Sequence, residues 1–435
     1  MPAEAGISAA ARCFARQSIP PFNQPSRRGA VRQSQEDVIA RFQYLAVAGF
    51  AATAISYGPA RMGFGLFVPE FRSAFDMSTT AVGFVSSLGF AGFFLGLVIA
   101  QGLLVRRGPA VPVMSGLIAA TAGMGIVALA PNLTVLAVGV FFAASSAGFA
   151  WTPFNDAVHR KIQDVDRPTA LSQISTGTGV GIAAAGLAAL AMVLTGLSWR
   201  ACWAFFVLAS ALALIANWAA LHGVERDPAG VPERGWRDLL RFAALPLFAI
   251  AFVYGTTSAI YISFAADHML ESGGVGGVPT AATPALVFVV YGLFGLTGLL
   301  AGGLKRLVGL PWLLRLLMLA GALSAALAAF PPGNGSGLIS SAGLQGVHVM
   351  MTSAVLAFWS ERLFPSLPSF SFTAALLAMA AGSMLGPAVA GVVADAFGTG
   401  AMFLGAAALP AATALLLRDR HVRERPLQGA LPEGS

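Results

Sequence analysis

The sequence contains few charged residues. Asp, Glu, Lys and Arg make up only 10% of its 435 residues, whereas soluble domains contain about 25%. Hydrophobic residues make up 57%, above the range of about 45–50% found in soluble domains. So few charges cannot cover the surface of a large soluble protein, which excludes a large soluble enzyme. We expect most of the surface to face a lipid bilayer.

The sequence also lacks the patterns of several other classes of protein. Its two cysteines, Cys13 in a polar segment and Cys202 in an apolar run, predict no disulfide framework. Its five histidines are scattered at spacings unlike those of a metal site. It contains neither the phosphate loop of an ATP-driven pump nor the filter-like repeat of a channel. We therefore expect no enzyme activity, no metal and no cofactor.

Long apolar runs recur along the chain. A helix needs about 20 mostly apolar residues to cross the hydrocarbon core, and it satisfies its own backbone hydrogen bonds there. Twelve runs are long enough, six before and six after the polar segment 222–241. We predict an all-α membrane protein with twelve transmembrane helices. The predicted spans are 43–67, 80–104, 110–130, 134–156, 170–196, 200–221, 243–264, 283–304, 311–330, 336–359, 370–394 and 400–417.

The basic residues are distributed unequally between the two sides of these spans. Of the 26 Lys and Arg residues, 22 lie on the side of the two tails, whereas the opposite loops contain only Arg72 and Arg200. Because basic residues collect in cytoplasmic loops, we expect both termini in the cytoplasm and a multi-pass location in the cell inner membrane. This orientation also explains the net charge of +7 without a nucleic-acid partner.

The spans and the polar segments predict a domain organisation. Residues 1–41 contain six arginines and no apolar region typical of a secretory signal, so we expect a disordered tail there. The predicted segments are a disordered basic cytoplasmic tail 1–41, an N-terminal six-helix bundle 42–221, a cytoplasmic linker 222–241, a C-terminal six-helix bundle 242–418 and a cytoplasmic tail 419–435.

The two halves of the chain resemble each other. Three motifs recur at offsets of 197, 201 and 205 residues. Six spans separate the copies, so both copies keep the same orientation, which defines a parallel repeat. Two parallel bundles around a central site are typical of carriers that work by alternating access. The matching pairs are Tyr57-Gly58 with Tyr254-Gly255, Gly102 to Gly108 with Gly303 to Gly309, and Gly181 to Gly186 with Gly386 to Gly391.

These motifs resemble those of the major facilitator superfamily over residues of about 42–418. The loops after spans 2 and 8 are similar to its Gly-x-Leu-x-Asp-Arg-x-Gly signature, with Val105 at the acidic position, and Trp199-Arg200 at the start of span 6 is also typical. Arg61 followed by Pro69 resembles the YbfB-like bacterial branch. The resemblance implies roles in the conformational change for Gly102, Arg106, Gly108, Gly303, Gly309, Gly386, Pro387, Gly391 and Asp395.

Arg61 is the ionisable residue that lies clearly inside a span. It follows Arg41 by 20 residues and precedes Glu70 by nine, or about 30 Å and 13 Å along a helix, which predicts a position in the outer half of the membrane. Burial of its charge costs at least about 2.5–3.5 kcal/mol, and no span offers an acidic partner at that depth. Arg61 is therefore expected to bind an anionic ligand in a central cavity. Alternatively, backbone carbonyls near Pro59 satisfy it, or it extends outward to the interface.

Further candidates for the cavity come from spans 1, 4, 7 and 10, which the resemblance implies line it. Polar residues on shared helical faces are expensive against lipid and so are expected to point inward, although interhelical hydrogen bonds explain them equally well. His348 titrates near neutral pH and is the candidate for carrying a coupled proton; the alternative is a hydrogen-bonded core histidine. The candidate substrate-binding residues are Arg61, Tyr57, Trp151, Asn155, Tyr254, Ser258, Tyr261, Gln345 and His348.

Secondary active transport of a small organic solute is the function that remains. Arg61 without a buried carboxylate favours an anion, moved by alternating access across the cytoplasmic membrane. The alternative is efflux of hydrophobic or cationic drugs by proton antiport. Span 5 carries Gly181-Ile-Ala-Ala-Ala-Gly186 instead of the Gly-Pro pair typical of drug antiporters, which argues against that alternative. The expected partners are a small-molecule substrate and the lipid bilayer, and the protein is expected to be a monomer.

Overall fold

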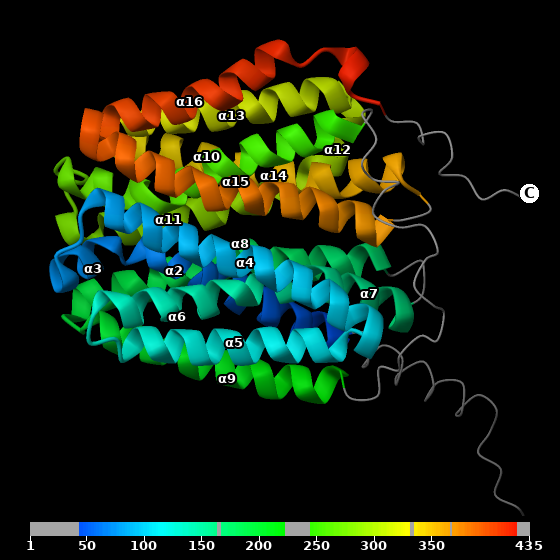
Figure 1. Cartoon of the computed structure of the whole chain (residues 1–435), viewed down its shortest axis with the longest axis horizontal. Coiled ribbons are helices and arrows are strands. Elements are labelled where there is room, and N and C mark those ends of the chain that lie inside the picture. Colours follow the sequence, from blue (N-terminus) through cyan, green and yellow to red (C-terminus); the bar gives the residue numbers. More distant parts are fainter. Residues whose placement is uncertain (1–42, 163–166, 222–243, 331–334, 366–367, 424–435) are drawn as a thin grey trace, which may run out of the picture. The chain divides into compact units, whose positions relative to one another are not determined.

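A computed structural model describes residues 43–162, 167–221, 244–330, 335–365 and 368–423 (Figure 1). The described part of residues 44–435 consists of helices, and no strand occurs among the residues described there. The predicted tail 1–41, the linker 222–241 and most of the tail 419–435 lie outside the described residues. The division into two bundles at those boundaries therefore stays a prediction.

The twelve predicted spans are confirmed, with small shifts at their ends. Eleven helical stretches of the described residues are long and apolar enough to cross a membrane, and a broken first span completes the twelve. The bounds after the first span are α4 Thr79–Arg107, α5 Ala110–Ala128, α6 Leu133–Ser145 with α7 Trp151–Lys161, α8 Arg167–Thr195, α9 Trp199–Leu221, α10 Leu245–Glu271, α11 Thr283–Gly295 with α12 Ala301–Val308, α13 Leu310–Ala329, α14 Gly335–Leu363, α15 Pro368–Phe397 and α16 Thr399–Leu416.

The first span is interrupted twice. Residues 44–55 are helical, a π-helical segment follows at Ser56–Ala60, and α2 (Arg61–Leu66) is separated at Phe67 from α3 (Val68–Phe75). Pro59 supplies no backbone N–H, so regular helical hydrogen bonding fails there. Arg61 therefore begins a new helix directly after the break. π-Helical segments occur frequently at functional sites.

Glycine turns with matching geometry end α4 and α12. Gly108 has φ of 76° and Gly309 has φ of 78°, a conformation that residues with a side chain rarely adopt. The two turns lie at equivalent positions of the sequence repeat. Gly102 and Gly303 differ from them, because a Cβ atom at either position would meet no atom within 4 Å.

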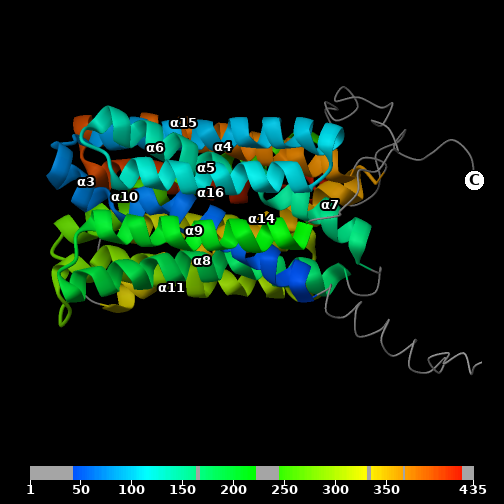
Figure 2. The ribbon, with the colours of Figure 1, turned by 90° about the horizontal axis from the view of Figure 1, so that it is seen from below.

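The first six spans pack against the last six along two seams. In one seam α4 lies beside α15, and in the other α8 lies beside α11 (Figures 1 and 2). A Cβ atom at Gly391 of α15 would lie 2.8 Å from the carbonyl oxygen of Thr79, so the two backbones touch. The backbone N–H of Ala388 donates to Oγ of Ser87 (2.9 Å), and that of Thr80 donates to Oδ2 of Asp395 (2.9 Å).

The α4–α15 seam contains several of the predicted conformational residues. A Cβ atom at Gly83 of α4 would clash with the carbonyl oxygen of Pro387, and one at Gly386 would lie 2.7 Å from that of Thr256 on α10. These positions accept only glycine in the observed arrangement. We call the end of the bundle at which α3 lies the α3 end and the opposite end the α7 end (Figure 2).

Candidate functional site

Arg61 lies at the break in the first span, surrounded by aromatic rings. Its guanidinium carbon lies 4.3 Å from the ring centre of Phe93 and 5.5 Å from those of Phe90 and Tyr57. Tyr57 is one turn earlier in the same span, as the sequence predicts, and both phenylalanines come from α4. The π faces of these rings attract a cation and partly compensate for its removal from water.

The guanidinium has no hydrogen-bonded partner in the described part of the chain. Its Nε atom is buried and makes no hydrogen bond, and no ion pair to Arg61 occurs among these residues. Backbone carbonyls near Pro59 therefore do not satisfy Arg61, one of the alternatives that the sequence left open. An arginine offers five N–H donors, so Arg61 retains its capacity to bind an acceptor.

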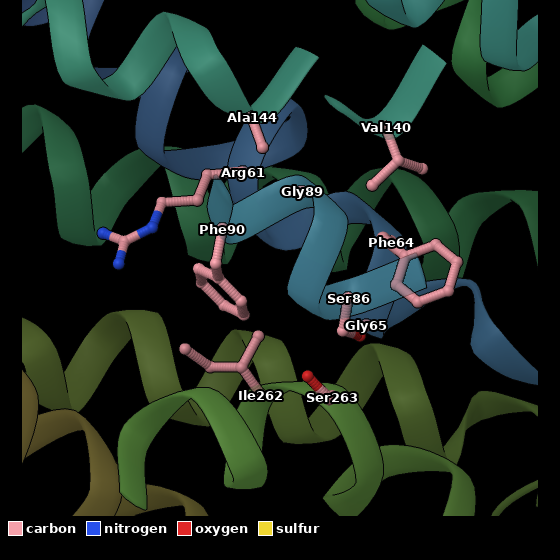
Figure 3. Close-up of a pocket in the computed structure, with 10 residues that line it drawn as sticks. All are labelled: Arg61, Phe64, Gly65, Ser86, Gly89, Phe90, Val140, Ala144, Ile262 and Ser263. Atoms are coloured by element: carbon pink, nitrogen blue, oxygen red, sulfur yellow. The ribbon is translucent and has the colours of Figure 1, made fainter. Parts of the chain in front are cut away.

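A small cavity lies beside Arg61, between the two halves of the protein. Figure 3 shows the guanidinium at one side of it, directed away from Phe64 and Ser86. Toward the α3 end the cavity closes where Gly65 touches the backbone of Ile262, because a Cβ atom at Gly65 would overlap the carbonyl oxygen of Ile262. The lining residues are Arg61, Phe64, Gly65, Ser86, Gly89, Phe90, Val140, Ala144, Ile262 and Ser263.

Tyrosines from three spans lie within the electrostatic reach of Arg61. The charge of Arg61 acts on the hydroxyl groups of Tyr57, Tyr254 and Tyr291. The Tyr254 hydroxyl donates to the carbonyl oxygen of Val349 (3.2 Å). The Tyr291 hydroxyl is buried and has no partner, so it retains both a donor and an acceptor.

The sequence prediction missed Tyr291 because the resemblance assigned the cavity to spans 1, 4, 7 and 10, whereas Tyr291 belongs to span 8. A signal existed in the composition. The chain has five tyrosines, and the four that follow Tyr44 all lie in this region.

The remaining candidates from α10 and α14 are buried within the last six spans. Tyr261 forms a hydrogen bond with Ser341 (2.9 Å), which ties its hydroxyl to α14. Oγ of Ser258 and Nε2 of Gln345 are buried without a partner. Gln345 lies one turn from Ser341 and one turn from Val349, the α14 residues that bind the two tyrosine hydroxyls. These unsatisfied polar groups therefore lie in the same layer as the tyrosines.

His348 is fully buried between helices of the last six spans. Its Nδ1 donates to the carbonyl oxygen of Leu317 (2.7 Å), and its ring lies against Gly321 and 5.6 Å from the ring of Tyr254. Nε2 has no partner. These contacts are those of a core histidine, and the proton-carrying role stays a prediction.

Trp151 and Asn155 are half-buried in α7, away from Arg61. Ala144 of α6 lines the cavity, and Asn155 follows it by 11 residues, which is about 16 Å toward the α7 end. The structure thus brings Tyr57, Tyr254 and Arg61 together but does not bring the α7 residues to them.

An ion-pair bridge joins the two halves at the α3 end, which the sequence prediction missed. Nη1 of Arg72 on α3 lies 2.7 Å from Oδ2 of Asp267 and 2.7 Å from Oε1 of Glu271, both on α10. The sequence placed the end of this span at residue 264, whereas α10 continues to Glu271. The extra two turns carry both carboxylates to Arg72.

These features define a class of protein. Twelve apolar helices in two repeated halves, with a half-buried, unpaired cation at their interface and a bridge closing one end, form a polytopic membrane transporter. The sequence matches the Major Facilitator Superfamily over residues 49–362, and the chain belongs to this family. It is not an enzyme family.

Curated relatives and solved structures agree with this assignment. The chain is 29% identical over 211 residues to monocarboxylate transporter 13 of Bos taurus, covering 47% of this chain and 48% of the relative. For the Rattus norvegicus protein of the same name, identity is 31% over 171 residues, with coverage of 39% and 38%. The chain thus matches half or less of the length of these relatives.

Two solved structures share the fold. A bacterial homolog of the human lysosomal transporter Spinster, inward-facing and unoccupied, has a TM-score of 0.68 at 16% identity and covers 88% of this chain and 98% of its own. The nucleoside transporter NupG has a TM-score of 0.66 at 13% identity, with coverage of 87% of this chain and 98% of its own.

Proposed function

We propose that the protein transports a small organic anion, and that Arg61 binds its negatively charged group. The observation that carries this proposal is the guanidinium of Arg61, which lies at the interface of the two halves with no hydrogen bond or ion pair in the described part of the chain. A half-buried charge without an acceptor is destabilising, and a carboxylate satisfies a guanidinium with two parallel hydrogen bonds.

The surroundings of Arg61 favour one negative charge on a small, partly apolar solute. The neighbouring side chains are the rings of Tyr57, Phe90 and Phe93 and uncharged hydroxyls, so Arg61 supplies the single charge of this site. A cationic drug would be repelled by Arg61 and would find no carboxylate among the residues that line the cavity. The name of the curated relatives, monocarboxylate transporters, supports the same substrate class.

Alternating access would proceed along the two seams between the halves. The arrangement is closed at the α3 end by the Gly65–Ile262 contact and the Arg72 bridge. Separation of α3 from α10 would open that end to Arg61. We further propose that the α3 end faces outward and that both termini are cytoplasmic in the inner membrane, because 22 of the 26 basic residues lie on the side of the tails.

Binding by the purified protein tests this function directly. Thermal shifts would be measured with a series of monocarboxylates and a series of hydrophobic cations, for the wild type and for Arg61→Ala. Loss of one partner of a desolvated charge pair costs about 2–5 kcal/mol, so Arg61→Ala should weaken carboxylate binding by at least about 30-fold. Arg61→Lys keeps the charge but not the planar donors and should bind with intermediate affinity.

A matched control removes a different arginine. Arg200 lies over the ring of Trp199 and donates to the carbonyl oxygen of Ala130 (3.0 Å). Arg200→Ala should retain carboxylate binding. Stabilisation of the wild type by cations alone would contradict the anion proposal and support drug efflux, and unchanged carboxylate binding by Arg61→Ala would exclude Arg61 as the binding residue.

A further inference from the structure

A second partly buried acidic group lies next to the Arg72 bridge. Glu70 is on α3, two residues before Arg72, and residues two apart on a helix point in different directions. Arg72 is occupied by Asp267 and Glu271 and also donates from Nε to the carbonyl oxygen of Met77 (3.2 Å). Arg72 therefore forms its ion pairs with Asp267 and Glu271 and not with Glu70.

Glu70 is half-buried at the closed end, where α3 packs against α10 of the other half. Its Oε2 atom is buried and has no hydrogen-bond partner. The charge of Asp267 on α10 acts on Glu70, and Glu70 in turn acts on the buried Cys202 of α9. Asp267 is nearly buried, with its side chain 8% exposed. Two ionised carboxylates at such a place repel each other, and a proton on one of them removes the repulsion.

We propose that Glu70 binds the proton that is taken up when the α3 end closes. The inference rests on alternating access but not on the nature of the substrate. In the closed arrangement Glu70 is partly desolvated and lies within the electrostatic reach of Asp267. When α3 separates from α10, water reaches the carboxyl group and the neighbouring negative charge moves away. The two arrangements therefore differ in their affinity for a proton, which is the requirement for coupling.

The direction of the coupling follows from the surroundings of Glu70. Burial raises the pKa of the Glu70 carboxyl above its ordinary value, its own backbone N–H opposes this shift, and Asp267 adds to it. α3 lies beyond the apolar run of the first span, so the open arrangement exposes Glu70 to water, where its pKa returns to its ordinary value. A lower pH thus favours closure, by about tenfold for each unit by which the two pKa values differ.

The other titratable groups near Glu70 predict a different response. Asp267 and Glu271 bind Arg72 as carboxylates, so loss of either negative charge would weaken the bridge and open the end rather than close it. His268 of α10 binds Thr399 through Nδ1 (2.9 Å). Asp395 of α15 is engaged with the backbone N–H of Thr80 and lies near Arg72 rather than Glu70.

The closure can be measured without any substrate. Nitroxide labels would be placed at the exposed residues Ser73 and Ser272, at the ends of α3 and α10, with Cys13 replaced by serine and Cys202 by alanine. The distance distribution between the labels would be recorded by pulsed electron resonance from pH 8 to pH 5. The short-distance population should increase as the pH falls. In Glu70→Gln, which imitates the protonated acid, it should remain at its low-pH value throughout.

Two variants serve as matched controls. Glu271→Gln removes an exposed carboxylate of the same bridge, so it should lower the closed population but keep its dependence on pH. His268→Asn should also keep it. A pH-independent wild type would overturn the proposal even if Glu70→Gln did not fold. So would a Glu70→Gln variant that still responds to pH, or a response that disappears in His268→Asn. None of these outcomes bears on anion binding by Arg61, which the thermal-shift series measures separately.

Discussion

Closure of the α3 end depends on the absence of a side chain at Gly65. A Cβ atom at this position would overlap the carbonyl oxygen of Ile262 on α10. Because the overlapping atom belongs to backbone, it cannot rotate away as a flexible side chain would. Gly65→Ala must therefore force α2 and α10 apart. Overpacking of a close contact costs about 1–3 kcal/mol, which corresponds to a decrease of about 5- to 150-fold in the ratio of closed to open α3 end.

The open arrangement does not need this contact, so the variant should still fold. The expected result is a lower rate of transport in proteoliposomes, together with a smaller short-distance population for the labels at Ser73 and Ser272. Gly405→Ala in α16 is the matched control, because a Cβ atom at Gly405 would meet nothing within 4 Å. It should behave as the wild type. Normal transport and normal closure in Gly65→Ala would refute the assignment of this contact as part of the closed end.

Three further predictions concern the site and the bridge. Tyr291→Phe removes a hydroxyl without a partner, so it should weaken carboxylate binding by about 3- to 10-fold with little change in melting temperature. Tyr261→Phe loses the hydrogen bond to Ser341, so it should lower the free energy of unfolding by about 1 kcal/mol and leave binding unchanged. Calorimetry measures the stability, and a binding assay measures the affinity. Arg72→Ala leaves nearly buried Asp267 unpaired, so it should reduce the closed population more than Glu271→Gln does in the same distance measurement. His348→Gln should keep the pH dependence of transport. A variant that lost this pH dependence would instead favour His348 as the residue that carries the proton.

The spans could be predicted because they depend on local properties of the sequence. Length and apolar composition give each helix, and the glycine turns at Gly108 and Gly309 repeat at the predicted offset. The predicted end of α10 was wrong by seven residues, since Asp267 and Glu271 are polar and are typical of a loop. Within the helix both carboxylates bind Arg72, almost 200 positions earlier in the chain. No local pattern reports such a partner.

The surroundings of Arg61 illustrate the same limit. The sequence indicated a buried charge without an acidic neighbour, and it placed Tyr57 beside it. Phe90 and Phe93, whose rings contact the guanidinium, were not predicted. In an apolar span, the sequence does not distinguish a phenylalanine that faces a cation from one that faces lipid. Pro59 indicated a break in the helix before Arg61, but the sequence did not predict that the break is a π-helical segment.

That segment gives the first span two parts with different attachments. Residues 44–55 contact α8, where a Cβ atom at Gly177 would overlap Phe50 and Thr53, whereas α3 is fastened to α10 through Arg72. The interrupted hydrogen bonding at Ser56–Ala60 would allow the second part to tilt while the first part remains anchored. Arg61 lies directly after this segment, at the junction of the two parts. A solute bound to Arg61, as proposed, would therefore act at the point from which a small change of angle produces a large displacement at the end of α3.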